Sequence, residues 1–392
     1  MAEIRVENLV KQFGSFAAVR DTSFTVRDGD FFCLLGPSGC GKTTTLRMVA
    51  GLELPTSGSI RLDGEDVTFR RARERDIAMV FQLFALYPHM NVRRNIAFPL
   101  LCVGMPRAEI VRRVEAAART LRIAHLLDKP VSGLSGGDRQ RVALGRALVR
   151  QPKAFMMDEP LGALDAEFRH IMCGELRTLH ERVRATTVYV THDQLEAMSM
   201  ADVIAVMNRG CIEQLASPQE IYDRPASIFV GEFIGSPAMN VLRFEGAVAP
   251  GATEVVLGDV PVAVPASREG RPGGPLVLGA RPEHVSLRGE GGVRGAVTGV
   301  EYLGTTQVVT VDTAHGRVKA RLPATDEVGV GERVGLSFRA PKLSLFDGTT
   351  GKVIRSALHD TPTQRPAAAR SHHAPGLAHS PGAAHSLGAS HG

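Results

Sequence analysis

Apolar and polar positions divide the chain into two parts of different texture. From residue 1 to about 236, short apolar runs alternate with longer segments whose apolar positions recur at helical spacing. The strands expected there occupy residues 31–35, 154–157, 187–190 and 203–207. The amphipathic helices expected there occupy residues 108–123 and 167–183. The four runs are apolar nearly throughout, as in strands that are covered on both faces. This alternation predicts an α/β layered domain over residues 1–236.

A second texture begins after residue 236, where Gly and Pro separate short Val-rich runs. These runs, at 254–257, 261–264, 275–280, 307–311 and 332–338, predict a small all-β, barrel-like domain over residues 237–355. Two stretches of similar strand density, 241–290 and 291–350, suggest a duplicated five-stranded barrel. Residues 356–392 are rich in Ala, His, Pro, Gly and Ser, so we expect a disordered tail and give a metal site among its histidines little weight.

Composition and charge narrow the class of protein. The 392 residues include 46 Lys and Arg against 41 Asp and Glu, and this mild excess is scattered, so it does not call for nucleic acid as a partner. The five cysteines are odd in number and lack CxxC spacing, which predicts neither a disulfide framework nor a zinc site. No apolar run reaches the roughly 18–20 residues that span a bilayer, and the first residues lack a secretion signal. We expect a soluble, intracellular protein.

A glycine-rich loop, GPSGCGKT at 36–43, follows the predicted strand at 31–35 and opens a predicted helix. This is the setting of a P-loop, in which successive backbone N–H groups bind phosphate oxygens. Lys42 would bridge the β- and γ-phosphates, and the Thr43 hydroxyl would bind Mg²⁺. The expected nucleotide-binding residues are Gly36, Pro37, Ser38, Gly39, Cys40, Gly41, Lys42, Thr43 and Thr44. Lys42 and the amides would lower the pKa of Cys40, which is either a reactive thiol or an inert small residue.

Two adjacent carboxylates end the buried run in AFMMDEP at 154–160. Asp158, at the tip of the predicted strand, is placed to hold Mg²⁺ through its water shell. Glu159 is placed to polarise an attacking water. The apolar run before them and the P-loop upstream favour this interpretation over that of a solvated acidic loop.

The segment LSGGD at 134–138, followed by RQRVALGRAL, resembles the signature motif of ABC-transporter ATPases. Phe13, the P-loop, Gln82, the signature, the DEP strand end, the ALD at 163–165 and His192 stand in the order and spacing of that family from residue 3 to about 236. The resemblance implies an α/β P-loop NTPase domain with a helical signature subdomain at about 85–150. It also implies that ATP is bound and hydrolysed with Mg²⁺.

The same resemblance implies roles for the remaining motif residues. Phe13 would stack on adenine, although a core phenylalanine is the alternative. Gln82 would contact Mg²⁺ and the attacking water, and His192 would hydrogen-bond the γ-phosphate. A second anion site at a helix start would complete the nucleotide pocket of another subunit, and Asp165 would link the two halves. That second site consists of Ser135, Gly136 and Gly137. A head-to-tail homodimer with ATP between the subunits follows.

Asp138 departs from the pattern, because the family usually has Gln there. A carboxylate close to a triphosphate is repulsive unless it points to solvent. We expect Asp138 to have a mild effect on turnover.

The strings at 278–285, 300–307 and 343–354 resemble the regulatory domain of importer ATPases of the maltose, glycerol-phosphate, spermidine and ferric-iron types. They imply that the β region is OB-like. Residues 229–240 look most like the carbohydrate and polyol branch, whereas DEPLGALDAEFR departs from the usual SNLDAKLR of that branch. Carbohydrate or polyol is the first cargo expected, with phosphonate, polyamine and ferric iron behind it.

The resemblance further implies two membrane permease subunits and an extracytoplasmic solute-binding protein as partners. The chain would then lie peripherally at the cytoplasmic face of the inner membrane. A soluble ABC ATPase that acts on ribosomes or DNA is one alternative, but it would usually carry tandem cassettes or a coiled-coil insertion. An interaction protein that uses nucleotide only as a switch is the other.

Overall fold

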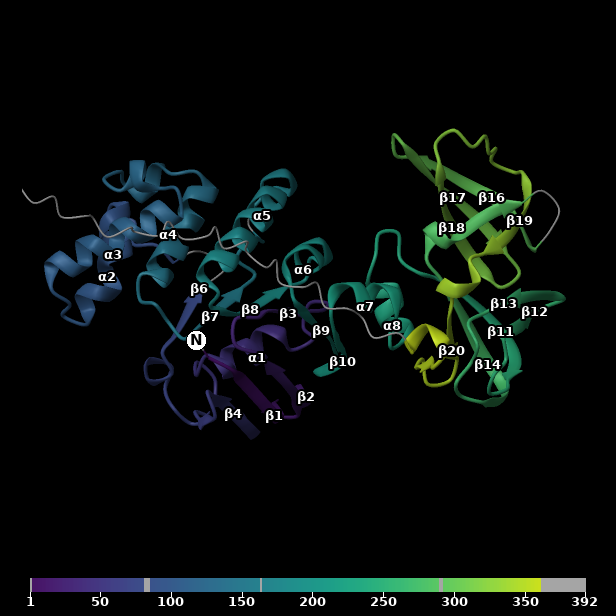
Figure 1. Ribbon diagram of the computed structural model, residues 1–392, viewed down its shortest axis with the longest axis horizontal. Helices are drawn as coiled ribbons and strands as arrows, with labels where there is room; N and C mark the ends of the chain where they lie inside the picture. The colour runs from purple at the N-terminus through teal and green to yellow at the C-terminus, as the bar shows by residue number, and fades with distance from the viewer. Residues whose placement is uncertain (1, 81–84, 163, 289–291, 361–392) are drawn as a thin grey trace, which may run out of the picture.

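The computed structural model describes residues 2–80, 85–162, 164–288 and 292–360. Figure 1 shows an α/β and helical body at one end of the molecule and an all-β body at the other. The short helices α7 (Pro218–Asp223) and α8 (Ile228–Phe233) lie between them. The chain thus changes from mixed helices and strands to mainly strands close to the predicted change of texture.

A central sheet, ordered β10-β9-β3-β8-β7-β6 in the described residues, forms the middle of the first body. Its strands are β3 (Phe31–Leu35), β6 (Ile77–Val80), β7 (Ala154–Asp158), β8 (Thr186–Thr191), β9 (Val203–Asn208) and β10 (Cys211–Ala216). Neighbours are parallel except β9 and β10. Each of the four strands expected from the apolar runs is confirmed, and β8 is buried along its whole length because both faces of the sheet are covered.

One face of the central sheet packs against helix α1 (Lys42–Val49), and a smaller antiparallel sheet covers this helix from outside. The smaller sheet has the order β2-β1-β4-β5, with β1 (Ile4–Phe13), β2 (Phe16–Val26), β4 (Ser57–Leu62) and β5 (Glu65–Asp66). Phe32 and Leu34 of β3 point into this layer, whereas their neighbours Phe31, Cys33 and Leu35 point to the opposite face. The P-loop helix is therefore held between two sheets.

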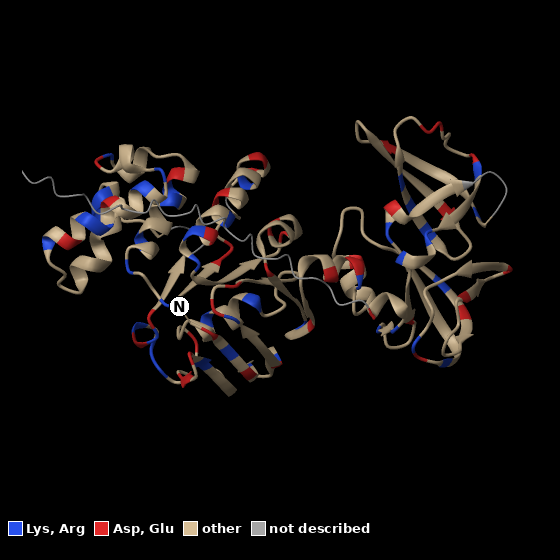
Figure 2. Cartoon of the chain, viewed as in Figure 1, with Lys and Arg blue, Asp and Glu red and all other residues tan. Residues whose placement is uncertain are grey.

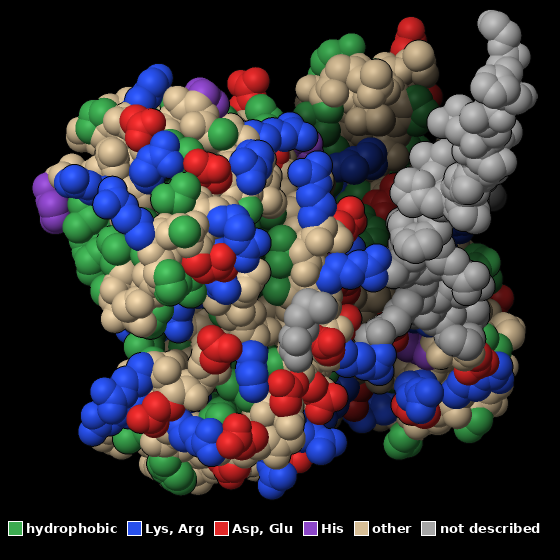
Figure 3. Space-filling view, turned by 60° about the vertical axis from the view of Figure 1, so that its left-hand side comes forward, with side chains coloured by type: hydrophobic (Ala, Val, Ile, Leu, Met, Phe, Trp, Pro, Cys, Tyr) green, Lys and Arg blue, Asp and Glu red, His purple; other side chains and the backbone are tan. Residues whose placement is uncertain are grey.

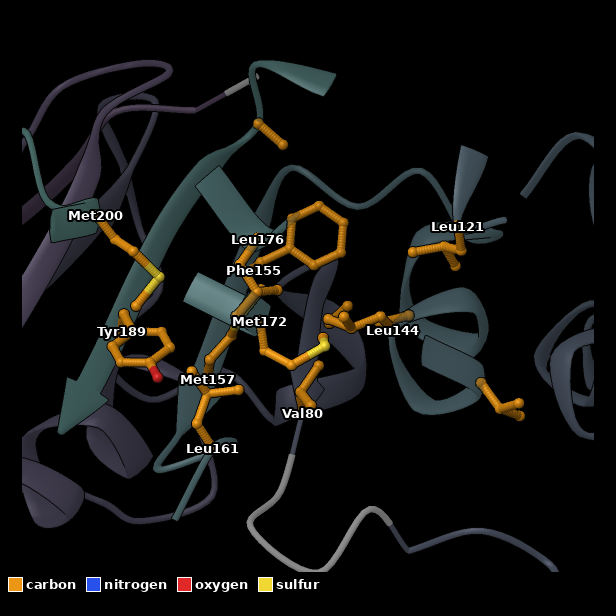
Figure 4. Close-up of a cluster of buried hydrophobic side chains, with 14 of the residues drawn as sticks. Val80, Leu121, Leu144, Phe155, Met157, Leu161, Met172, Leu176, Tyr189 and Met200 are labelled. Carbon is orange, nitrogen blue, oxygen red and sulfur yellow. The ribbon is translucent and has the colours of Figure 1, made fainter. Parts of the chain in front are cut away.

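The opposite face of the central sheet is covered by helices. They are α2 (Val92–Cys102), α3 (Arg107–Thr120), α4 (Gly136–Leu148), α5 (Ala166–Val183) and α6 (Gln194–Met200), with the single turns η1 (Ala72–Glu74), η2 (Ala124–Leu126) and η3 (Val131–Gly133) elsewhere in this body. Helices α3 and α5 confirm the two amphipathic predictions. Figure 4 shows Phe155 and Met157 of β7 beside Met172 and Leu176 of α5, with Leu144 of α4 facing them. This shared core joins α4 to the central sheet.

The second body contains two larger sheets and a hairpin. The first sheet has the order β11-β14-β20-β21, the hairpin is β12-β13, and the second sheet has the order β15-β19-β16-β17-β18. Their bounds are β11 (Asn240–Val248), β12 (Glu254–Leu257), β13 (Val260–Ala263), β14 (Arg271–Ala280), β15 (Val285–Arg288), β16 (Val293–Tyr302), β17 (Thr306–Thr313), β18 (Gly316–Pro323), β19 (Arg333–Phe338), β20 (Ser344–Asp347) and β21 (Val353–Ile354), with turns η4 (Pro282–His284), η5 (Ala340–Lys342) and η6 (Ala357–His359). The fold is all-β and OB-like, as expected.

The expectation of a duplicated barrel is wrong. Strand β14, from the first stretch, pairs with β20 from the second, and β15 pairs with β19. The two stretches thus exchange strands and bury one common core. Pairing between strands distant in sequence cannot be read from strand density alone.

The expected start of the tail is also wrong by a few residues. Ser356 is buried, and the backbone N–H of Ala357 donates to the carbonyl of Ala266. Residues 356–360 therefore belong to the β body, and the remaining tail histidines lie outside the described residues. Among the described helices, none has both the length and the apolar character needed to cross a bilayer.

Arg281 connects the two bodies. Its guanidinium is buried, lies 4.1 Å from the centroid of the Tyr222 ring and donates to the carbonyls of Tyr222 and Gly231 at 2.9 and 3.0 Å. The Tyr222 hydroxyl in turn donates to Glu283 at 2.8 Å. The β body is thus anchored to α7 and α8 through buried hydrogen bonds.

Charges of both signs occur on both bodies (Figure 2). Figure 3 shows Lys and Arg interspersed with Asp and Glu on the face it displays. No single-sign field dominates that face, in agreement with the scattered basic residues of the sequence.

Candidate active site

The loop between β3 and α1 is shaped by glycines that no other residue can replace. A Cβ on Gly36 would lie 2.3 Å from the carbonyl oxygen of Met207, and one on Gly41 would lie 2.5 Å from that of Ala18. Gly41 also has φ of 104°, a conformation that L side chains rarely adopt. The loop therefore curls tightly at the start of α1, where backbone N–H groups attract anions.

Lys42 is buried inside this loop. Its Nζ donates to the carbonyl oxygens of Gly36 and Pro37 at 2.8 and 2.9 Å. The ammonium is held at the concave side of the loop, where it can bind phosphate oxygens.

The expectation that Cys40 has a lowered pKa is wrong. Burial of the thiol is the largest effect and raises the pKa of Cys40, although Lys42 acts in the opposite direction. The structure therefore favours the interpretation of Cys40 as an inert small residue, and its Sγ would lie only 2.8 Å from a Cβ on Gly36.

Thr43 and Asp158 come together from two different elements. The Thr43 hydroxyl donates to Oδ1 of Asp158 at 2.9 Å, which links α1 to the carboxyl end of β7. Burial raises the pKa of Asp158, and the hydrogen bond from Thr43 opposes that change. A hydroxyl next to a carboxylate offers the hard oxygen ligands that Mg²⁺ prefers. In the described residues no cluster of three or more His, Cys, Asp or Glu could hold a metal ion.

Glu159 and His192 lie at the ends of neighbouring strands. In the parallel register Asp158 is opposite Val190 and Leu35 is opposite Thr191, so the ends of β3, β7 and β8 share one edge of the sheet. Nδ1 of His192 lies 3.2 Å from Oε1 of Glu159. The structure thus places the predicted base, the predicted γ-phosphate sensor and the P-loop at one edge.

The predicted signature residues start helix α4. The Ser135 hydroxyl caps the helix by accepting from the backbone N–H of Asp138 at 3.2 Å. A Cβ on Gly137 would lie 2.2 Å from the ring of Phe168, so any other residue there would have to displace that ring. Gly136 is exposed. Helix α4 packs on the helical side of the sheet, whereas α1 lies on the other side (Figure 1).

The Asp138 side chain turns back toward the start of its own helix. Its Oδ2 accepts from the Ser135 hydroxyl at 2.8 Å, and its Oδ1 lies 3.3 Å from Nη1 of Arg141. The short side chain at the third helical position folds back onto the hydroxyl of the cap residue.

The other predicted residues are placed as follows. The Phe13 ring is 49% exposed at the end of the β1–β2 hairpin, so the alternative of a core phenylalanine is wrong. Asp165 caps α5 by accepting from the backbone N–H of Phe168 at 2.9 Å. Pro37, Ser38 and Thr44 lie in the P-loop and the first turn of α1. Gln82 lies outside the described residues.

Sequence reasoning missed Arg169. Its Nη1 donates to Oδ2 of Asp193 and its Nη2 to the carbonyl of Leu164, both at 2.9 Å. The loop after β7 is thus tied to the residue that follows His192. Asp193 followed three residues later by Glu196 matches the pattern of a helix N-cap. The sequence therefore contained a signal for the cap residue that Arg169 contacts.

Arg75 was missed as well. Its Nη1 donates to the carbonyls of Met48 and Val49 at 2.7 and 2.8 Å, and its Nη2 donates to the carbonyl of Thr68 at 3.0 Å. Burial lowers its pKa to about 10. Arg75 thereby satisfies the last carbonyls of the P-loop helix. Four arginines stand within residues 70–75, and nothing in the sequence indicates which one is buried.

A glycine-rich loop at a helix start, a hydroxyl hydrogen-bonded to a carboxylate and a second carboxylate next to histidine are the features of a P-loop nucleoside triphosphate hydrolase. Residues 19–162 match the ABC transporter family, residues 235–285 the MalK OB fold domain and residues 278–346 the TOBE domain.

The chain is 45% identical over 381 residues to the trehalose/maltose import ATP-binding protein MalK of Thermococcus litoralis, covering 90% of this chain and 100% of that one. It is 46% identical over 360 residues to the sn-glycerol-3-phosphate import ATP-binding protein UgpC of Cereibacter sphaeroides, covering 90% and 99%. The solved structure of cbiO1 from Clostridium perfringens, part of the ABC transporter complex cbiONQ, is 28% identical with a TM-score of 0.53, covering 56% of this chain and 89% of that one. The chain belongs to the import ATP-binding subunits of the ABC-transporter family, which bind and hydrolyse ATP to drive transport.

Proposed function

We propose that this subunit energises the uptake of a carbohydrate or polyol through membrane permease subunits, together with an extracytoplasmic solute-binding protein. The observation that carries this proposal is the likeness along 90% of the chain to import subunits for trehalose or maltose, sn-glycerol 3-phosphate and trehalose. The subunit would act at the cytoplasmic face of the inner membrane as a peripheral protein. In this proposal the permease and the solute-binding protein select the cargo.

The nucleotide would lie between two copies of this chain. The P-loop and the signature residues Ser135, Gly136 and Gly137 occupy opposite layers of the molecule, so one chain supplies two separate half-sites. A head-to-tail homodimer lets the signature of one copy complete the P-loop site of the other. Asp165, at the start of α5, would lie near the contact between the copies, and Phe13 would support the adenine.

Catalysis would rely on positioning and charge. The P-loop amides and Lys42 would hold the β- and γ-phosphates, and Glu159 would accept a proton from the attacking water. His192 would orient the γ-phosphate beside Glu159, with Gln82 contacting the attacking water. Bound Mg²⁺ would neutralise phosphate charge, held by Thr43, Asp158 and Gln82. Loss of the γ-phosphate would weaken closure, which couples hydrolysis to the permease.

Uptake in cells tests the proposal. Cells lacking the gene should lose uptake of labelled trehalose, maltose or sn-glycerol 3-phosphate, whereas uptake of a control amino acid should be unchanged. Complementation by the parent should restore uptake, and complementation by Lys42→Ala should not, because phosphate binding is lost. Unchanged uptake of every carbohydrate and polyol tested in the deletion strain would contradict the proposed cargo.

A further inference from the structure

The signature serine of this chain already has an anionic partner. The Ser135 hydroxyl donates to Oδ2 of Asp138 at 2.8 Å, while the backbone N–H of Asp138 donates to Ser135 Oγ at 3.2 Å. A serine hydroxyl has a single proton. That proton is therefore committed to the carboxylate of Asp138.

The charge of Asp138 is only partly balanced. Nη1 of Arg141 lies 3.3 Å from Oδ1 of Asp138, while Nη2 of the same arginine lies 2.8 Å from Glu175 of α5. One guanidinium thus serves two carboxylates. Arg139, the next residue, donates to the carbonyl of Ser132 at 3.0 Å.

The carboxylate stands where an incoming phosphate would seek donors. The start of α4 carries the positive end of the helix dipole, and a carboxylate in the first turn is stabilised by that dipole in the same way as a bound anion. With 27% of its side chain exposed, Asp138 is neither buried away nor fully screened by water. A γ-phosphate must replace it as acceptor for Ser135 and approach its negative charge.

We propose that Asp138 is a positioning residue that raises the ATP concentration needed to close the dimer. It holds the Ser135 hydroxyl on its own carboxylate and repels the γ-phosphate bound to the partner copy. This inference rests on the proposed ATP-bridged homodimer. Because the repulsion opposes closure and leaves the P-loop, Glu159 and His192 unchanged, Asp138 affects the ATP dependence much more than the saturated turnover rate.

The test compares full-length Asp138→Asn with the parent. Asparagine keeps the size of the side chain and an oxygen that accepts from Ser135, but it removes the charge. The ATP concentration at half-maximal ATPase rate should fall by roughly 5- to 20-fold, with kcat changed by less than about threefold. Asp138→Glu retains the charge and should stay close to the parent. Asp128→Asn is the matched control, since it removes the same charge from an exposed side chain paired with Arg93.

Two further measurements isolate the cause. In the Glu159→Gln background, light scattering should show ATP-driven dimers of Asp138→Asn at lower ATP than dimers with Asp138, and binding of ADP should be equal. The difference should shrink at high salt, because partly exposed charges are screened. Equal ATP dependence of the two proteins, or a difference that salt does not change, would overturn the inference. If no variant dimerises with ATP, the proposed homodimer itself fails, and the role of Asp138 fails with it.

Discussion

Glu159 adopts a left-handed backbone conformation, with φ of 45°, that residues other than glycine seldom take. Its backbone N–H donates to the carbonyl of Val190 at 3.0 Å, and its own carbonyl accepts from Gly162 at 3.1 Å. These bonds fix the conformation and direct the carboxylate toward His192. At the scale of single residues, the backbone thus places the carboxylate that we propose as the base.

Glu159→Gln should lower the ATPase rate at least about 100-fold, since an amide cannot accept the proton of the attacking water. ATP should still bind, because the P-loop and Lys42 are unchanged. Phosphate release and equilibrium binding of ATP measure the two effects. Glu167→Gln, an exposed change in the first turn of α5, is the control. A Glu159→Gln protein that turns over at the parental rate would exclude this role for Glu159.

At the scale of elements, the P-loop helix depends on a residue outside its own sequence. Helix α1 has only eight residues and no side-chain cap at its start. A helix this short is marginal by itself. Its last carbonyls are satisfied by Arg75, and a Cβ on the neighbouring Gly51 would lie 2.6 Å from Nε of that arginine. The position of the P-loop is therefore set jointly by α1 and the segment that contains η1.

Arg75→Met should destabilise the protein by about 2–4 kcal/mol, because buried carbonyls lose their donors. ATP affinity should fall as well, since α1 carries the P-loop. Urea unfolding followed by circular dichroism measures the first effect, and nucleotide binding the second. Arg73→Met, at a side chain that is 75% exposed, should leave both unchanged. Equal stability of the two variants would show that Arg75 does not support α1.

At the scale of the whole molecule, the two bodies are joined next to the sheet edge that carries Glu159 and His192. The Gln194 side chain, two residues after His192, accepts from the backbone N–H of Gly235 at 2.8 Å and donates to the carbonyl of Phe233. Arg281 of the β body donates to the carbonyl of Ile234, which lies between Phe233 and Gly235. The linker, residues 233–235, therefore contacts Gln194 on one side and Arg281 of the β body on the other.

Arg281→Met should loosen this joint. We expect chymotrypsin to cleave the chain at Phe229 and Phe233 on the order of tenfold faster, since cleavage requires local opening of α8. The fragments can be identified by mass. Arg339→Met, at an exposed arginine of the β body, should be cleaved at the parental rate. Unchanged cleavage of Arg281→Met would show that the joint is held by other contacts.

Much of this protein was determined by the sequence itself. The apolar runs predicted β3, β7, β8 and β9, because strands buried on both faces need apolar side chains throughout. The P-loop glycines and the DEP carboxylates predicted phosphate and metal binding, because such binding requires those residues in a fixed local order. Local periodicity and local motifs are visible without the fold.

Only the tertiary structure decided the rest. Packing placed Glu159 beside His192 and buried Arg75 rather than one of the nearby arginines. It also raised the pKa of Cys40 by burial and paired β14 and β15 with strands from the second stretch of the β body. It also turned Asp138 onto Ser135 instead of toward solvent. Each of these depends on neighbours distant in the chain or on the direction of a side chain. The long-range contacts arise when layers pack, and no local pattern encodes them, whereas the contact of Asp138 with Ser135 spans only three residues and depends on the direction of the side chain.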